Sequence, residues 1–370
     1  MNRRRFMQYS GLAMGASALP NAVIGQANDH ATQARAAGAT FPRRFGWGSA
    51  TASYQVEGAS QEGAVGFLYR DTFSHRQGRT LNDDTGDVAD GFYHLYPQDI
   101  ALMKDLGLKT FRLSIAWSRV FPTGTGQPNQ VGMDFYNRLV DTLLAADIQP
   151  YCTLYHWDLP EALQDNGGWE NRDTTKAFAD CAGYSAGKVS DRVKQFMTMN
   201  EMRSSVGIGY GSAVYAPGLK LNAQKLAQLN QFVCLVHGMA VQSIRASAKP
   251  GTRVGIDENA DATIPVIETP ERIEAGRRAM REQNAMLLTA VQEGRYTDPY
   301  LKRLGANAPK CTTEEIDIIR TPMDFVGLNV YQPTYIRAAA DEYGYAVVPS
   351  PSSYPHMYIS WLTVGPEALY

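Results

Sequence analysis

Short apolar runs with the character of β-strands alternate with longer helical patterns along most of this chain. The strand-like runs are 45–51, 108–117, 148–157, 253–256 and 324–331, and a further one begins at Phe196. Apolar residues at helical spacing mark 133–146, 224–247 and 271–292, and Thr312 with Glu315 forms a capping box that opens a short helix. This alternation predicts an α/β fold with six parallel strands and crossover helices.

Two α/β architectures have this alternation, a doubly wound sheet and an eightfold barrel. The doubly wound nucleotide-binding fold needs a glycine-rich phosphate loop. The nearest candidate runs from Gly207 to Gly211, but position 212 is Ser where the third glycine would be required. The sequence therefore favours a (β/α)8 barrel, of which about six of the eight βα units are present.

The first 27 residues have the three regions of an export signal. Arg3 and Arg4 precede an uncharged stretch at 9–24, and small residues at 25–27 form a plausible cleavage site. The order of the arginines resembles a twin-arginine signal, which predicts contact with the twin-arginine export machinery and a periplasmic destination. The apolar stretch is too short and mild for a permanent membrane anchor. A frayed basic terminus is the alternative, and 28–40 is expected to be a linker.

Charge and cysteine usage narrow the class of partner. The 370 residues carry a formal net charge of -2, so no basic excess points to nucleic acid, and a small or neutral partner is expected. The four cysteines form no Cys-x-x-Cys pair and the six histidines no His-Glu-x-x-His motif. We therefore expect buried free thiols, no metal and no cofactor, while the oligomeric state stays open.

The run that begins at Phe196 ends in a carboxamide and a carboxylate, Asn200 and Glu201. In parallel barrels the reactive groups lie at the carboxyl ends of strands. A Glu after apolar residues is partly shielded from water, which suits a proton donor near neutral pH. Taken alone, such a pair is more often a turn or the start of a helix than a catalytic site.

Four other strand-like runs also end in polar or aromatic residues. These are Gln55, Arg112, His156 with Trp157, and Asn329 with Tyr331. Such groups on one rim would bind sugar hydroxyls and stack on pyranose faces. Other roles stay open: Arg112 could pair with a core carboxylate, Gln55 and Asn329 could satisfy backbone groups of the rim, and Trp157 could belong to the core.

Six ordered motifs give the chain a specific resemblance. They are the start at 45–51 that leads to Tyr54-Gln-Val-Glu-Gly58, Phe111-Arg-Leu-Ser-Ile-Ala-Trp-Ser-Arg119, Leu154-Tyr-His-Trp-Asp-Leu-Pro160, Thr198-Met-Asn-Glu201, Ala216-Pro-Gly218 and Phe325-Val-Gly-Leu-Asn-Val-Tyr331. With these motifs the chain resembles glycoside hydrolase family 1, the β-glucosidase and β-galactosidase family with a (β/α)8 barrel, from about residue 45 to 370.

The resemblance implies a β-glycoside as substrate and a role for each rim residue. Glu201 matches the acid/base that protonates the leaving oxygen and later deprotonates water. Asn200 matches the residue that hydrogen-bonds the sugar 2-hydroxyl. Gln55, His156 and Trp157 match groups around the hydroxyls of the sugar that is cleaved.

The resemblance also implies a second carboxylate, which this sequence lacks. Arg112 and Tyr331 match the pair that orients the nucleophile and keeps it ionised, with Asn329 beside them. The family carries the nucleophile in a Thr-Glu-Asn-Gly segment on the seventh strand, and no such segment occurs here. We therefore expect residues 41–370 to form a barrel truncated before that strand, and Glu367 is a poor substitute.

Three functions follow as hypotheses. The first is a β-glycosidase that acts with retention on terminal β-glucosides or β-galactosides, with turnover impaired because the nucleophile is missing. The second is an inactive sugar-binding remnant. The third is a barrel lyase or aldolase, which would need a Schiff-base lysine at a strand end; Lys109 and Lys194 lie within their runs instead.

Overall fold

A computed structural model describes residues 41–43, 45–359 and 361–369. The expected export signal at 1–27 and linker at 28–40 lie outside the described residues. The chain divides into two compact units, 1–46 and 47–370. All the helices and strands below belong to the second unit. None of the helices described is long and apolar enough to cross a membrane.

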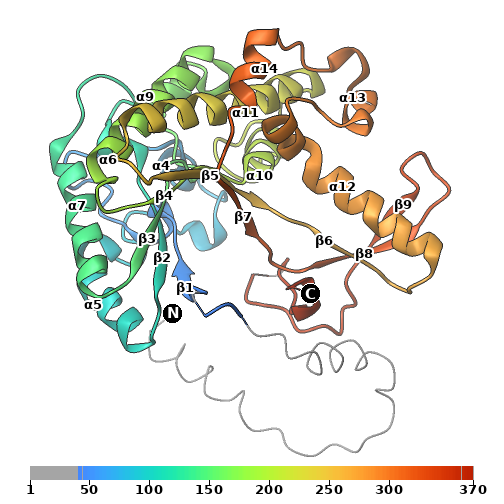
Figure 1. Cartoon of the computed structure of the whole chain (residues 1–370), viewed down its shortest axis with the longest axis horizontal. Helices are drawn as coiled ribbons and strands as arrows, with labels where there is room; N and C mark the ends of the chain where they lie inside the picture. The colour runs from blue at the N-terminus through green and yellow to red at the C-terminus, as the bar shows by residue number, and fades with distance from the viewer. Residues whose placement is uncertain (1–40, 44, 360, 370) are drawn as a thin grey trace, which may run out of the picture. The chain divides into compact units, whose positions relative to one another are not determined.

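A curved sheet of six parallel strands forms the centre of this unit (Figure 1). In sheet order the strands are β1 (Gly48–Ala50), β2 (Thr110–Ser114), β3 (Gln149–Thr153), β4 (Gln195–Asn200), β5 (Arg253–Asn259) and β7 (Phe325–Asn329). The sheet order follows the chain order, as right-handed βα crossovers dictate. Because all six strands are parallel, their carboxyl ends meet at one edge.

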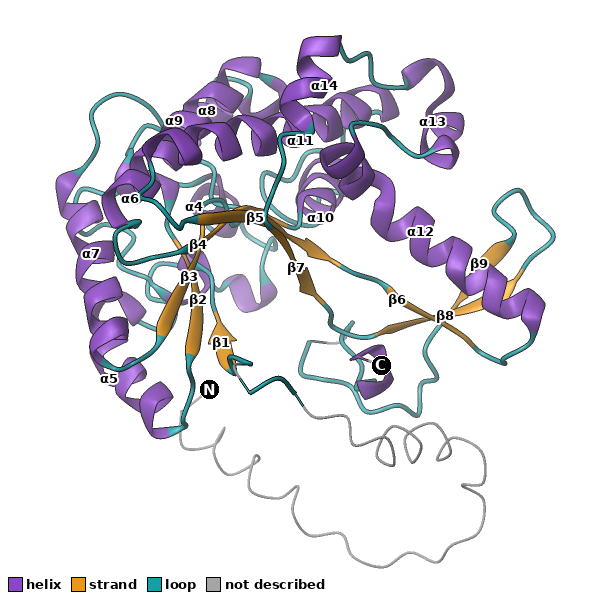
Figure 2. Cartoon of the chain, viewed as in Figure 1, coloured by secondary structure: helices purple, strands orange, loops and turns teal. Residues whose placement is uncertain are grey.

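Four long helices connect the strands and lie along the outer side of the sheet (Figure 2). They are α5 (Phe92–Asp105), α7 (Gln130–Ala145), α9 (Arg172–Val189) and α11 (Ala223–Ser247). Between β5 and β7 follow the long α12 (Pro270–Glu293) and the shorter α13 (Asp298–Leu304) and α14 (Thr313–Ile319). The predicted helices at 133–146, 224–247 and 271–292 are thus confirmed. α7 begins three residues early because the Asn129 side chain accepts a hydrogen bond from the Val131 N–H and caps it.

The predicted capping box at Thr312 is also present. The Thr312 hydroxyl accepts from the Glu315 N–H at 3.2 Å, and the Glu315 carboxylate accepts from the Thr312 N–H at 3.1 Å. Shorter helices follow the strands: α3 (Ser53–Val56), α4 (Tyr69–Ser74), α6 (Trp117–Val120), α8 (Glu161–Asp165) and α10 (Met202–Val206). The glycine segment Gly207–Gly211 forms a single π turn after α10, not a phosphate loop.

The core lies between the sheet and these helices. The apolar face predicted for α7 is buried, including Phe135, Tyr136 and Leu139. A group of edge-to-face and tilted rings, Trp117, Trp169 and Phe178, fills the space under α9. Cys152, Cys181 and Cys234 are buried free thiols and Cys311 is half-buried, as expected.

A second, three-stranded sheet was not predicted. Its strands are β6 (Ala262–Pro265), β8 (Pro333–Ala338) and β9 (Tyr345–Val348), in the order β6-β8-β9. α12 packs on this sheet through Ala275 and Ala279 against Ile336. β6 begins within four residues of the end of β5, and β8 within four residues of the end of β7. In the sequence, β6 and β8 therefore look like loops that follow the strands before them. The predicted α/β class with six parallel barrel strands is confirmed.

Candidate functional site

Glu201 lies directly after β4, with a backbone conformation that is uncommon for a residue other than glycine. Its φ is 53° and its ψ 61°, in the left-handed region. The Glu201 N–H donates to the Asp257 carbonyl on β5 at 2.8 Å. This bond belongs to the Asn200–Asp257 pair, which resumes the parallel β4–β5 ladder after its register shifts between Met197 and Asn200. Strained backbone of this kind concentrates at functional sites.

Two donors hold one oxygen of the Glu201 carboxyl group. Asn329 Nδ2 donates to Oε1 at 2.7 Å, and the Tyr331 hydroxyl donates to the same oxygen at 3.0 Å. Burial, followed by the nearby charge of Glu201, raises the pKa of Tyr331, so Tyr331 stays a phenol that can donate. Glu201 is 7% exposed. The carboxyl group is therefore oriented by residues from β7 and from the link that follows it.

Arg112 on β2 joins the two asparagines to a buried carboxylate. Its Nη1 donates to Asp257 Oδ2 at 2.8 Å, to Asn329 Oδ1 at 3.2 Å and to Asn200 Oδ1 at 3.3 Å. Asn329 Nδ2 also donates to Asn200 Oδ1 at 2.9 Å. The oxygen of the Asn200 amide thus accepts twice, which leaves its NH2 group as the part that can donate to a ligand.

The end of β3 supplies an imidazole and an indole to the same rim. His156 is buried, and burial, with the charges of Arg112 and Arg70, lowers its pKa well below the ordinary value, so it is neutral. Its Nδ1 is buried without a hydrogen-bond partner among the described residues. Such an orphan nitrogen is suited to a ligand hydroxyl.

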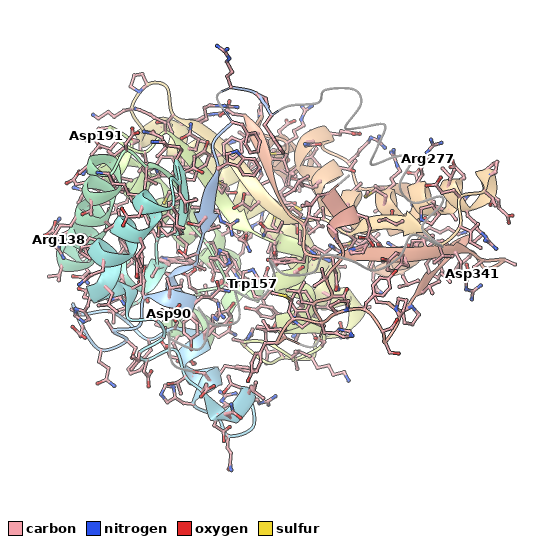
Figure 3. The ribbon with its side chains drawn as sticks, turned by 90° about the horizontal axis from the view of Figure 1, so that it is seen from below. Asp90, Arg138, Trp157, Asp191, Arg277 and Asp341 are labelled. Atoms are coloured by element: carbon pink, nitrogen blue, oxygen red, sulfur yellow. The ribbon has the colours of Figure 1, made fainter. Side chains whose placement is uncertain are left out.

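Trp157, the next residue, repeats the backbone geometry of Glu201. Its φ is 63°. Its Nε1 donates to the Asn200 carbonyl at 2.9 Å, and its ring meets that of Tyr215 edge to face. Trp157 also packs against the core, which is the alternative role that the sequence left open for it. Figure 3 places it near the middle of the view, whereas Arg277 and Asp341 lie toward the margin.

Gln55, also predicted for the rim, is exposed to solvent and does not lie directly at a strand end. It lies on α3, within the few residues that follow β1. The structure thus brings Arg112, Asn200, Glu201 and Asn329 into one hydrogen-bonded network. Tyr331 and Trp157 each donate a hydrogen bond to this network, His156 precedes Trp157 after β3, and Gln55 lies apart on α3.

The structure places two carboxylates that were not predicted at the end of β5: Asp257, which joins the site, and Glu258, which lies behind it. Asp257 is 4% exposed and carries the ion pair with Arg112, which is the alternative that the sequence left open for this arginine. Here Arg112 contacts Asp257 and Tyr331 contacts Glu201, and the role expected of this pair toward a nucleophile stays a prediction. Both new residues were missed because the predicted strand ended at Ile256, although the rule that identified Asn200 and Glu201 applies here too.

Glu258 faces away from Arg112, on the other side of the strand. It is 2% exposed; its Oε1 accepts from the Asn259 N–H at 3.1 Å, while its Oε2 has no hydrogen-bond partner in the described part of the chain. Burial raises the pKa of Glu258 to about 7, against the opposing effect of Arg203. No cluster of three or more His, Cys, Asp or Glu residues suited to a metal is found within the described ranges.

A family model described as glycosyl hydrolase family 1 matches residues 37–363. Among curated proteins, beta-glucosidase A of Acetivibrio thermocellus is 40% identical over 300 residues, which cover 80% of this chain and 66% of that protein. A bifunctional beta-D-glucosidase/beta-D-fucosidase of Bifidobacterium breve is 38% identical over 352 residues, covering 89% and 74%. The chain spans about two thirds of the length of several curated relatives, the Acetivibrio thermocellus protein included.

Solved structures show the same relationship. A family 1 β-glucosidase from Thermotoga maritima matches with a TM-score of 0.81 and 35% identity, covering 89% of this chain and 73% of that one. A rice β-glucosidase mutant in a covalent complex with Glc matches with a TM-score of 0.83 and 33% identity, covering 89% and 75%. At these identities the likeness extends beyond the fold to the sequence.

Proposed function

The chain belongs to glycosyl hydrolase family 1, and we propose that it is a β-glycosidase that acts on terminal β-glucosides or β-galactosides with retention of configuration. Its relatives are named as β-glucosidases. The substrate is then a small neutral glycoside, in keeping with a formal net charge of -2 and no basic excess. No cofactor is required for this chemistry.

The arrangement of the Glu201 carboxyl group carries the proposal. Asn329 and Tyr331 both donate to Oε1, so a proton on Glu201 resides on the other oxygen, Oε2. Glu201 would give this proton to the leaving glycosidic oxygen and then take one from water. The NH2 group of Asn200 would donate to the sugar 2-hydroxyl, and His156 with Trp157 would surround the other hydroxyls.

Retention needs a second carboxylate about 5 Å from the acid/base to form the glycosyl-enzyme. Asp257 is the neighbouring candidate, but its Oδ2 is held by Arg112 and Thr153 and the side chain is buried. We therefore propose that these 370 residues alone turn over slowly. Sugar binding without turnover is the second candidate, and the buried unpartnered Nδ1 of His156 favours it.

Hydrolysis of an aryl β-glucoside, together with calorimetric titration of glucose, tests both candidates. Turnover that Glu201→Gln abolishes would support the glycosidase. Glucose binding without turnover would support the second candidate. The matched control is Glu282→Gln, which removes a buried carboxylate on α12 from its ion pair with Arg303 of α13. If the unmodified chain shows no turnover and binds no glucose, both candidates are refuted.

We also propose that the chain is exported to the periplasm through a twin-arginine-type signal. The support is the order of Arg3 and Arg4 before an uncharged stretch at 9–24. Cell fractionation should find the Arg3→Lys, Arg4→Lys double variant in the cytoplasm and the matched Arg43→Lys variant in the periplasm. Equal periplasmic pools of the two variants would refute this proposal.

A further inference from the structure

We propose that Asp257 is a positioning residue of the sugar site, which fixes Arg112 through its side chain and Glu201 through its backbone. The inference depends on the proposed function, because the network it organises is the proposed sugar site. Asp257 is assigned no role by the motifs that define the resemblance, and it lies on β5, a strand that contributed no residue to the predicted rim.

The side chain of Asp257 is the anchor of the arginine. Its Oδ2 accepts from Arg112 Nη1 at 2.8 Å and from the Thr153 hydroxyl at 3.3 Å. Arg112 is 20% exposed and Asp257 5% exposed in their side chains, so water screens this ion pair little. A charge-assisted bond in such surroundings holds the guanidinium in one place.

The backbone of Asp257 is the anchor of the acid/base. Its carbonyl accepts from the Glu201 N–H at 2.8 Å, at the point where the β4–β5 register shifts. Across the sheet, Asp257 pairs with Gly327 of β7, and a Cβ on that glycine would lie 2.0 Å from Asp257 Oδ1. Only glycine at 327 leaves room for the carboxylate, so three strands define its position.

Arg112, held in place by Asp257, in turn orients the side chains that would contact the sugar. The guanidinium donates to the amide oxygens of Asn329 and Asn200, and Asn329 Nδ2 in turn donates to Asn200 Oδ1. A fixed Arg112 therefore sets which way Asn329 faces, and it sets Asn200 both directly and through Asn329. Asp257 is itself too buried to touch a sugar, so it acts through Arg112 and is not a catalytic residue.

The test is to measure the affinity of the full chain for glucose after the substitution Asp257→Asn. This substitution keeps the shape of the side chain and removes its charge. We expect about tenfold weaker binding. Glu282→Gln, which removes the charge from a comparable buried ion pair with Arg303, should bind within about twofold of the unmodified chain. An affinity for Asp257→Asn within that same range, or an equal loss in both variants, would overturn the proposal.

Two further measurements keep the outcome decisive. If Asp257→Asn does not fold, Thr153→Val, which removes the second donor to Oδ2, should weaken glucose binding about threefold, and unchanged binding overturns the inference. If the unmodified chain binds no glucose, the proposed function fails by itself. The anchoring of Arg112 is then decided by urea unfolding: Arg112→Gln should lower the midpoint less when Asp257→Asn is present, and equal shifts overturn it.

Discussion

Replacing Glu258 by glutamine should stabilise the protein at neutral and alkaline pH and leave it unchanged in acid. Glu258 is buried at the end of β5, and one of its oxygens has no hydrogen-bond partner within the residues described. A charged carboxylate in such a place costs free energy, because water solvates the ion in the unfolded chain and little replaces that solvation in the fold. Glutamine has a similar shape and carries no charge at any pH.

The pKa of Glu258 gives the size and sign of the effect. Burial raises the pKa from 4.5 to about 7. Between these values the folded state binds more protons than the unfolded state, so the free energy of unfolding falls as pH rises. The difference corresponds to roughly 3 kcal/mol, fully present below pH 4.5 and lost as pH rises through 7. The variant escapes this loss and should be more stable than the unmodified protein by about that amount at pH 8.

Urea unfolding of both proteins at pH values from 4.5 to 8 measures the difference directly. Other titrating groups are shared, so their effects cancel in the comparison. Glu342→Gln, which alters an exposed carboxylate between β8 and β9, is the control and should show no such trend. A difference between the Glu258→Gln and unmodified proteins that stays constant with pH would show that Glu258 is not held neutral by burial, and the reasoning would fail.

Three further predictions each concern one residue. Tyr331→Phe removes one hydrogen bond to Glu201 Oε1 and should lower aryl β-glucoside turnover, or glucose affinity where turnover is absent, about tenfold; an unchanged value would contradict the orientation argued for this carboxyl group. Burial lowers the pKa of His237 to about 4, so the folded state binds fewer protons than the unfolded one and stability falls as pH drops from 6.5 to 4; His237→Phe should flatten that fall by roughly 3 kcal/mol in urea unfolding, and an identical slope would refute it. Thr312→Ala removes the cap of α14 and should cost about 1 kcal/mol, with a null effect on the urea midpoint counting against the capping box.

Much of the fold could be predicted from the sequence because the relevant signals are local. Helical spacing in α7, α11 and α12 and the capping box of α14 depend on residues a few positions apart. The strand ends also follow from local patterns, and with them the approach of Asn200 to Arg112 and Asn329. The second sheet could not be predicted, because β6 and β8 follow β5 and β7 within four residues and pair with each other only through contacts distant in sequence.

The site shows the same division. That Glu201 and Tyr331 would share a rim followed from strand ends and from the resemblance, but the hydrogen bond between them did not, because the family pattern assigned Tyr331 to another carboxylate. Asp257 and Glu258 were missed for a physical reason. Acidic residues rarely occupy a buried strand, so the run appeared to end before them.

Tyr331 lies in the three-residue link between β7 and β8, and this placement has a mechanical consequence. The tyrosine is tied at one side to the central sheet and at the other to the small sheet that rests on α12 (Figure 1). A shift of the small sheet therefore moves the Tyr331 hydroxyl, and with it the hydrogen bond to Glu201 Oε1. The hairpin of β8 and β9 begins two residues after Tyr331, so a displacement of this hairpin changes the direction in which the Glu201 carboxyl group is held.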